Sequence, residues 1–135
     1  MANTFHLQIV TPDGLLFDGN AQRILVRTTE GDVGILSGHS DYVSPVATGM
    51  TRVTMDDGEV KTAACSGGFI SVKKGITRLV ANTFEWAEDI DVERAKRAQT
   101  RAEEKLKEAS DYAERAAEIK LKRAITRIRV GEGTK

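Results

Sequence analysis

The chain has 135 residues, enough for one ordinary domain or two small ones whose buried core needs no disulfides. Its 20 basic and 20 acidic side chains cancel, which excludes a general nucleic-acid-binding protein, because phosphate contacts need a basic surface. A hydrophobic fraction of 40% with 30% charged residues excludes wholesale disorder and is typical of a soluble globular protein.

No segment of the sequence predicts membrane insertion or export. No apolar run approaches the roughly 20 residues that span a bilayer, and the N-terminus lacks the charged-then-apolar pattern of a signal peptide. The single cysteine, Cys65, cannot form an internal disulfide. These features fit a reducing, cytosolic compartment.

Residues 1–86 predict an antiparallel β-sandwich of about ten strands. Short β-branched runs alternate with turn signals, and the Pro12-Asp13-Gly14 sequence is typical of a tight turn. Asp57-Gly58 and Lys74-Gly75 indicate two further hairpin turns. The runs that read as strands are residues 5–10, 15–17, 21–28, 50–55, 59–64, 69–73 and 76–81.

Residues 87–135 predict a two-helix antiparallel hairpin. Residues 91–130 hold no glycine or proline, Asp91 is a suitable N-cap, and the D-x-x-E spacing that begins at Asp111 marks a second helix start. Apolar residues recur every three or four positions. The first stripe is Val92, Ala95, Ala98, Ala102, Leu106 and Ala109, and the second is Ala113, Ala117, Leu121, Ala124, Ile125 and Ile128.

Alanine dominates these stripes, so the two helices are expected to hold each other weakly, since burial stabilises by only about 25 cal/mol per Å² of apolar surface. A single continuous helix over 92–130 would be about 58 Å long. Two interpretations therefore stay open: a hairpin docked permanently on the sandwich, or a switch between compact and extended forms.

The zero net charge hides an asymmetry between the two parts. Residues 1–90 hold seven basic and eleven acidic side chains, a charge of −4, and the last 45 residues carry +4. Five Lys or Arg residues fall within residues 119–129 with no acid between them. Such a run is either a solvated face or a contact for an anionic partner: a nucleotide phosphate, an acidic protein segment or an acidic membrane surface.

The sequence predicts no catalytic or metal-binding residues. His39, Ser40 and Asp41 are adjacent, so they cannot form a triad, and Cys65 reads as a small buried hydrophobic residue. Two histidines, His6 and His39, are too few for a zinc cluster. The Ser66-Gly67-Gly68 sequence lacks a nucleotide-loop pattern and reads as a tight turn.

Several motifs together resemble the epsilon subunits of bacterial F-type ATP synthases, called delta in mitochondria. Residues 10–14 (VTPDG) with Phe17 and Gly19 look like the opening hairpin of that family, and residues 31–39 (GDVGILSGH) are similar to its most distinctive loop. Residues 66–69 (SGGF) match a strand entry and residues 87–91 (AEDID) the junction. Ser37, where proline is usual, and the Asp41-Tyr42 pair, where Pro-Leu is common, depart from the pattern.

The resemblance implies a non-catalytic central-stalk, or rotor, subunit. Its sandwich would bind the gamma subunit and stand on the membrane ring of c subunits, with Asp32 and His39 as candidates for that rotor contact. Its hairpin would permit ATP hydrolysis when compact. When extended along gamma, the basic second helix would contact acidic segments of the alpha/beta catalytic head and block hydrolysis.

Some members of the family bind ATP in the compact form through an Ile/Leu-Asp-x-x-Arg-Ala motif, which residues 90–95 (IDVERA) match in full. The resemblance therefore implies a regulatory ATP site, although no cofactor is required. The candidate nucleotide-binding residues are Glu85, Ile90, Asp91, Arg94, Ala95, Arg101, Arg123 and Arg127.

The expected function is thus a subunit that couples proton flow to ATP synthesis and inhibits ATP hydrolysis. It would lie peripherally at the cytoplasmic face of the bacterial cell membrane. The alternative is a free-standing nucleotide-sensing adaptor built from the same sandwich and hairpin. A small hydrolase that uses His39 or Cys65 is a weaker third hypothesis.

Overall fold

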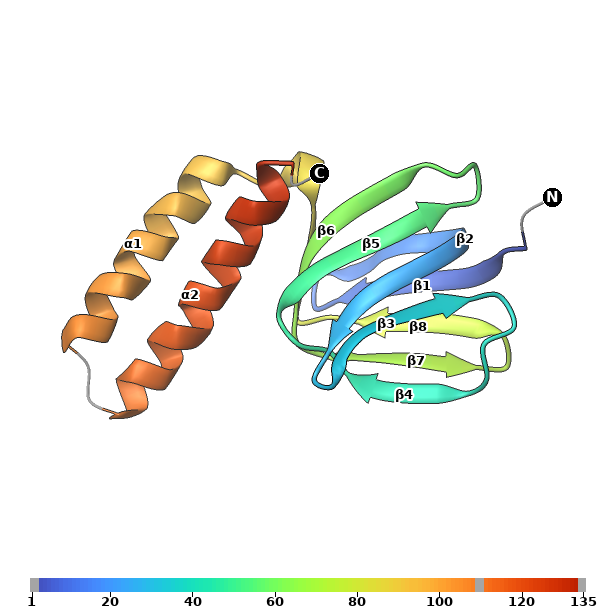
Figure 1. Ribbon diagram of the computed structural model, residues 1–135, viewed down its shortest axis with the longest axis horizontal. Coiled ribbons are helices and arrows are strands. Elements are labelled where there is room, and N and C mark those ends of the chain that lie inside the picture. The colour runs from blue at the N-terminus through green and yellow to red at the C-terminus, as the bar shows by residue number, and fades with distance from the viewer. Residues whose placement is uncertain (1–2, 109–110, 134–135) are drawn as a thin grey trace.

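A computed structural model describes residues 3–108 and 111–133. The strands are β1 (Phe5–Thr11), β2 (Gly14–Thr28), β3 (Gly31–Leu36), β4 (Tyr42–Pro45), β5 (Gly49–Met55), β6 (Val60–Ser66), β7 (Phe69–Lys73), β8 (Ile76–Val80) and β9 (Thr83–Trp86). The helices are the short η1 (Ala87–Asp89), α1 (Val92–Glu108) and α2 (Asp111–Gly131). The strands form a sandwich, and α1 and α2 form a hairpin at one end of it, with α2 nearer the strands (Figure 1). The predicted sandwich followed by a two-helix hairpin is confirmed.

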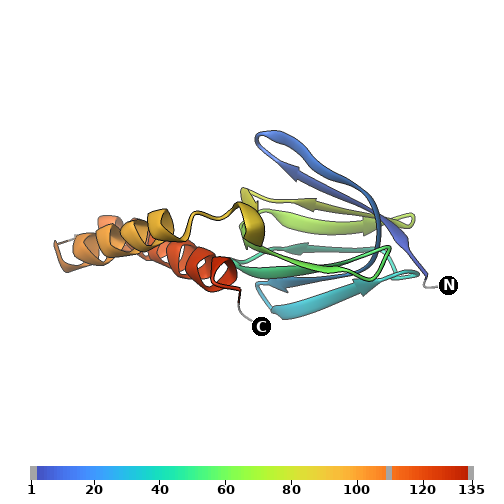
Figure 2. The same ribbon diagram turned by 90° about the horizontal axis from the view of Figure 1, so that it is seen from above.

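β2 belongs to both layers of the sandwich. Residues 14–21 of this strand pair with β1, and residues 21–28 pair with β3 and β5. A register irregularity between Ala21 and Arg23 lies at the changeover, as expected where a strand bends from one layer to the other. The hydrogen-bonded order is β4-β7-β8-β1-β2-β5-β6-β9, with β3 also paired to β2. The two layers are seen edge-on in Figure 2.

The strands differ from the sequence expectation at several places, and β4 and β9 are not among the expected runs. The runs at 15–17 and 21–28 are parts of one strand, because Gly19 continues the extended backbone instead of forming a turn. Residues 31–36, which resemble a family loop, form β3 in a hairpin with β2. The pairing of β1 with β8 is parallel, whereas every other strand pair in the described residues is antiparallel.

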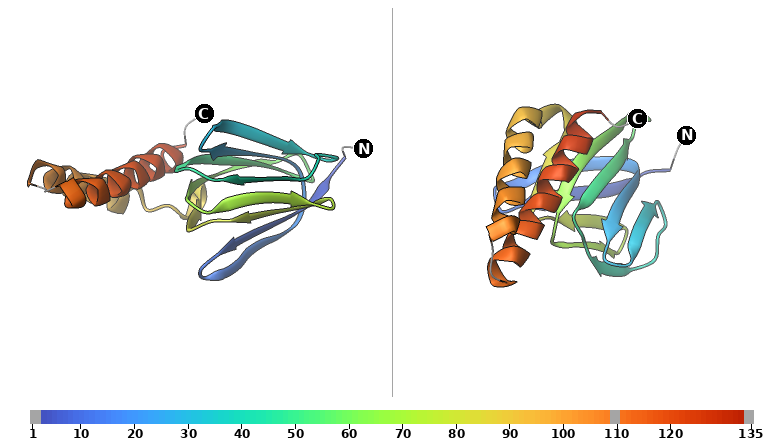
Figure 3. Two further views of the ribbon diagram at one scale, coloured as in Figure 1. Left: turned by 90° about the horizontal axis from the view of Figure 1, so that it is seen from below. Right: turned by 60° about the vertical axis from the view of Figure 1, so that its left-hand side comes forward.

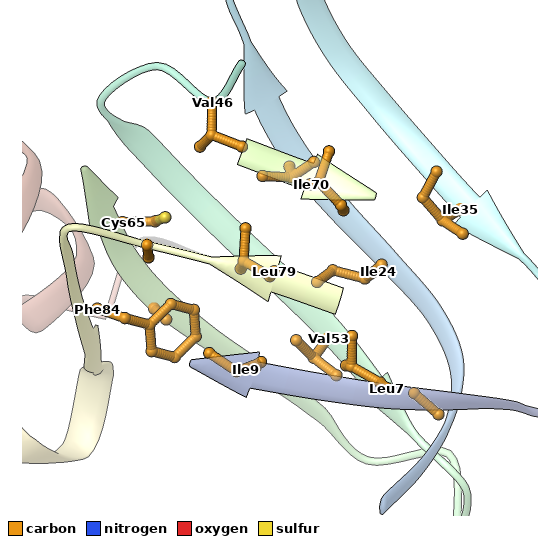
Figure 4. Packing of buried hydrophobic residues seen from close by; sticks show 14 of the residues in the cluster. Leu7, Ile9, Ile24, Ile35, Val46, Val53, Cys65, Ile70, Leu79 and Phe84 are labelled. Atoms are coloured by element: carbon orange, nitrogen blue, oxygen red, sulfur yellow. The ribbon is translucent and has the colours of Figure 1, made fainter. Parts of the chain in front are cut away.

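The core lies between the two layers. Alternate residues of β1 and β2 point inward, and Leu7, Ile9 and Ile24 are fully buried (Figure 4). Trp86 also belongs to this core, because its ring packs edge-on against Phe84 with ring centres 5.0 Å apart. The sandwich therefore has a hydrophobic core of its own.

The buried residues of the hairpin are small. In its described part they are Ala95, Ala102, Ala117, Ala124 and Val130. Ile125, which the second predicted stripe includes, is exposed, so the prediction is wrong for that side chain. The predictions for Ala109, Asp111 and Ala113 concern side chains outside the described set. The alanine-rich seam leaves little apolar area to hold α1 against α2.

Candidate nucleotide-binding cleft

A cleft of about 500 Å³ lies between the sandwich and the hairpin. The turn between β1 and β2 and the segment 82–85 line the sandwich side, and residues 89–101 with the last turns of α2 line the helical side. The tip of the β1–β2 hairpin, drawn in blue, projects toward the end of the sandwich that carries the helices (Figures 2 and 3). The lining residues are Thr11, Asp13, Asn82, Thr83, Phe84, Glu85, Asp89, Ile90, Asp91, Arg94, Ala95, Ala98, Arg101 and Arg127.

The cleft brings together all the candidate nucleotide-binding residues except Arg123. The fold brings together residues that are up to 42 positions apart in the sequence. Arg127 Nε of α2, for example, donates to Glu85 Oε1 of β9 at 2.9 Å. Their part in binding a nucleotide stays a prediction, but their placement around one cleft makes such a role geometrically sound.

Two arginines of α1 face the cleft without partners. Arg94 and Arg101 are seven residues apart, which puts them on the same side of the helix. Within the described residues, neither guanidinium group makes an ion pair or a hydrogen bond. Unpaired cations on one wall favour an anionic ligand, and guanidinium groups suit phosphate in particular.

Three residues of the 90–95 motif also have structural roles. The Asp91 carboxylate accepts the Arg94 backbone N–H at 3.0 Å, so it caps α1 as predicted. Ala95 is buried in the helical seam. A Cβ on Gly131 of α2 would lie 2.9 Å from Cγ2 of Ile90, so Ile90 packs on the end of that helix. The motif therefore shapes the junction whether or not a ligand is present.

Arg123 lies next to the cleft and fastens α2 to the sandwich. Its Nε donates to Ser66 Oγ at 2.9 Å, and Ser66 Oγ is 3.1 Å from Thr48 Oγ1. An adjoining hollow of about 370 Å³ is lined by Arg123 together with Arg101 and Arg127. To reach a ligand in the main cleft, Arg123 would have to leave Ser66.

Sequence reasoning missed the residues on the sandwich side of the cleft, chiefly Thr11, Asp13 and Asn82. The turn at Pro12 was recognisable, but no spacing in the sequence connects it with a helix that begins about 80 residues later. Only the tertiary arrangement identifies these residues.

Asp32 and His39 lie far apart. The Asp32 carboxylate, at the start of β3, forms an ion pair with Arg27, whose Nε lies 2.8 Å from Asp32 Oδ1. His39 follows the other end of β3, where its Nδ1 lies 2.7 Å from the Ser40 carbonyl oxygen and its ring packs edge-on against Tyr42. At about 3.3 Å per residue the length of β3 separates them, so they do not form one cluster.

The side chains of His39, Asp41 and Cys65 do not form a catalytic arrangement. Burial raises the pKa of Cys65 to about 11, so its thiol stays protonated at neutral pH and is a poor nucleophile. Asp41 Oδ1 accepts the Lys74 backbone N–H, and His39 faces Tyr42, so these two side chains form no relay. No group of three or more potential metal ligands occurs among residues 3–108 and 111–133.

Comparison with known proteins agrees with the fold. Residues 4–87 match the β-sandwich domain of the ATP synthase delta/epsilon chain, and residues 88–132 match its long α-helix domain. The chain belongs to the ATP synthase delta/epsilon family.

The sequences of bacterial members of the delta/epsilon family align with most of the chain. The ATP synthase epsilon chain of Caldanaerobacter subterraneus subsp. tengcongensis is 40% identical over 131 residues, 96% of this chain and 95% of that one. The epsilon chain of Alkaliphilus oremlandii is 46% identical over 106 residues, 78% of each chain. A chain in the Euglena gracilis mitochondrial ATP synthase has a TM-score of 0.79 at 26% identity, covering 88% of this chain and 76% of its own.

Proposed function

We propose that this chain is a central-stalk subunit of an F-type ATP synthase, non-catalytic by itself. It would couple proton flow to ATP synthesis and inhibit ATP hydrolysis through a mobile hairpin. The observation that carries the regulatory part is the attachment of α2 to the sandwich. The side-chain hydrogen bonds there include those from Arg123 to Ser66 and from Arg127 to Glu85. Polar contacts of this kind exchange readily for water, so they suit a reversible joint.

The partner proposed for the sandwich is the gamma subunit. An apolar row crosses five neighbouring strands on the outer face of the sandwich, from β4 to β2, with Leu15 and Phe69 exposed. Such a row is unusual on a surface that stays in water and supports docking of another protein. Its members, in register, are Pro45, Phe69, Val80, Val10 and Leu15.

The c-subunit ring is the second proposed partner, through Asp32 and His39. Among the described strands β3 pairs only with β2, so its outer edge is open. A partner that touches both residues must extend along that edge. The proposed location is peripheral, at the cytoplasmic face of the bacterial cell membrane. No helix in the described residues is both long and apolar enough to cross a membrane.

The hairpin would serve as the regulatory arm, with ATP as the ligand of the compact form. Phosphates would meet Arg94, Arg101 and Arg127, and the ligand would stabilise the arrangement in which these arginines lie around one cleft. In the extended form the basic run of α2 would contact acidic segments of the alpha/beta catalytic head. Inhibition would then result from locking rotor to stator.

Isothermal titration of ATP into the full chain tests the nucleotide part. Arg94→Ala should weaken binding by about ten- to a hundredfold, since it removes a charged contact to phosphate. Arg97→Ala is the matched control, because Arg97 lies on α1 outside the cleft. Asp91→Ala should weaken binding as well, although it also removes the cap of α1. If the unaltered chain gives no heat with ATP, the motif at 90–95 is only structural.

The alternative, a free-standing nucleotide-sensing adaptor, differs in its partners. Purification of the tagged chain from the native bacterium should recover a complex that contains the gamma subunit. If the chain never associates with such complexes, the rotor assignment fails and the adaptor is favoured.

A further inference from the structure

The cleft has two walls of different chemistry. The helical side carries the guanidinium groups of Arg94, Arg101 and Arg127 together with the carboxylates of Asp89 and Asp91, of which Asp91 caps α1. On the sandwich side Glu85 pairs with Arg127, and the β1–β2 turn presents the hydroxyl of Thr11 and the carboxylate of Asp13. A carboxylate accepts hydrogen bonds but repels phosphate. The cleft thus suits an elongated ligand that is anionic at one end and carries hydroxyl or amino donors at the other.

Asp13 is held in place by a rigid turn. The Asp13 N–H donates to Thr11 Oγ1 at 3.2 Å, Pro12 fixes its own φ, and Gly14 adopts a φ of 119° that other residues rarely reach. Thr11 and Gly14 are paired in the β1–β2 ladder. Within the described residues the Asp13 carboxylate makes no ion pair and no hydrogen bond, so it is available to a ligand.

We propose that Asp13 determines ligand specificity in this cleft by accepting hydrogen bonds from the non-phosphate part of a nucleotide. This inference rests on the proposed nucleotide binding. It adds to the site the β1–β2 turn, which lies outside the 90–95 motif. The donor is a ribose hydroxyl or the amino group of the base. Either contact points the phosphates away from Asp13 and toward the arginines.

The arrangement also explains how a ligand would restrain α1. In the compact form α2 contacts the sandwich, and α1 packs on α2 (Figure 1). A nucleotide that joins Arg94 and Arg101 of α1 to Asp13 would connect α1 directly to the sandwich. Binding energy would then act on α1 as well as on α2.

The test is titration of ATP and of inorganic triphosphate into the full chain and its Asp13→Ala variant. ATP affinity should fall about tenfold, the factor expected for one hydrogen bond to a charged group. Triphosphate affinity should stay within about twofold, because the lost contact is not to phosphate. Asp56→Ala is the matched control, since Asp56 lies outside the cleft.

Two further ligands identify the donor. If Asp13 accepts from the ribose, 2′-deoxy-ATP should bind the unaltered chain more weakly than ATP does. If it accepts from the base, inosine triphosphate, which lacks the amino group, should be the weaker ligand. In either case Asp13→Ala should abolish that difference.

Three results would overturn the proposal. One is an unchanged ATP affinity in Asp13→Ala. Another is an equal loss for ATP and triphosphate, which would place Asp13 at the phosphate end. The third is the absence of ATP binding by the unaltered chain, which would refute the nucleotide function itself and is distinguishable from the other two. Equal thermal unfolding temperatures without ligand would show that the variant folds.

Discussion

Cys65 shows how position in the fold decides the chemistry of a single side chain. It lies in β6 with 2% of its surface exposed, and burial disfavours the thiolate. Its pKa is raised from 9.0 to about 11. Because the folded-state pKa lies above the unfolded value, the folded protein binds this proton more tightly.

The residue-scale prediction is a loss of stability in alkali. The contribution of the neutral thiol is complete below pH 9 and is lost as the pH rises toward 11, by about 2 to 3 kcal/mol. Urea unfolding of the native chain and of Cys65→Ala at several pH values isolates this effect from the titration of Lys and Tyr. An equal decline in both proteins would show that the thiol ionises without cost in the folded state.

Residue patterns indicated only part of the site. The 90–95 motif and the arginine spacing on α1 were readable because they are local in the chain. Arg123 was assigned by resemblance, yet its Nε is engaged with Ser66. The sequence did not identify Asp13 as a site residue, because only the fold places the β1–β2 turn beside the helices.

At the scale of elements, the end of α2 packs closely on the junction. Gly131 is helical, and a Cβ there would lie 2.7 Å from Cγ2 of Val92 and 2.9 Å from Cγ2 of Ile90. Both methyl groups belong to β-branched side chains, which are stiff at χ1. Gly131 therefore permits an approach that any larger residue would prevent.

Gly131→Ala should shift the hairpin away from the docked form, although alanine favours the helix itself by about 1 kcal/mol. The overpacking is expected to destabilise docking by about 1 to 3 kcal/mol. Hydrogen exchange of residues 87–92 measures the shift, with Glu132→Ala at the neighbouring exposed position as control. Exchange equal to that of the unaltered chain would mean that the side chains of Ile90 and Val92 move aside at no cost in free energy.

Elements whose sequence has a clear hydrophobic periodicity were predicted well, and elements without it were not. The two helices follow from residues 91–130, which lack glycine and proline. The strands β4 and β9 have four residues each, β4 contains Pro45, and the six residues of β3 include two glycines, so none of the three shows the β-branched run that marks the other strands. Their pairing partners, not their own sequences, make them strands.

At the scale of the whole molecule, the sandwich and the hairpin have separate cores. The largest fully buried side chains lie mostly in the strands, and Trp86 packs against Phe17 and Phe84 of the sandwich. Removing the hairpin would therefore leave the hydrophobic core of the sandwich intact.

Deletion of residues 91–135 should give a folded sandwich that still assembles with gamma but no longer inhibits ATP hydrolysis. Circular dichroism of the fragment and the hydrolysis rate of the reconstituted complex are the measurements. The matched control is the full chain with Arg97→Ala, which keeps the hairpin. Unchanged inhibition by the truncated chain would contradict a regulatory role of the helices.

The strand β2 has a mechanical consequence. Its 15 residues are hydrogen-bonded to β1 in one layer and to β3 and β5 in the other. A sideways force on one layer would be carried to the other by covalent backbone as well as by side-chain contacts between layers. The layers cannot slide past each other without stretching β2, so a torque applied at one face would turn the sandwich as a single stiff body.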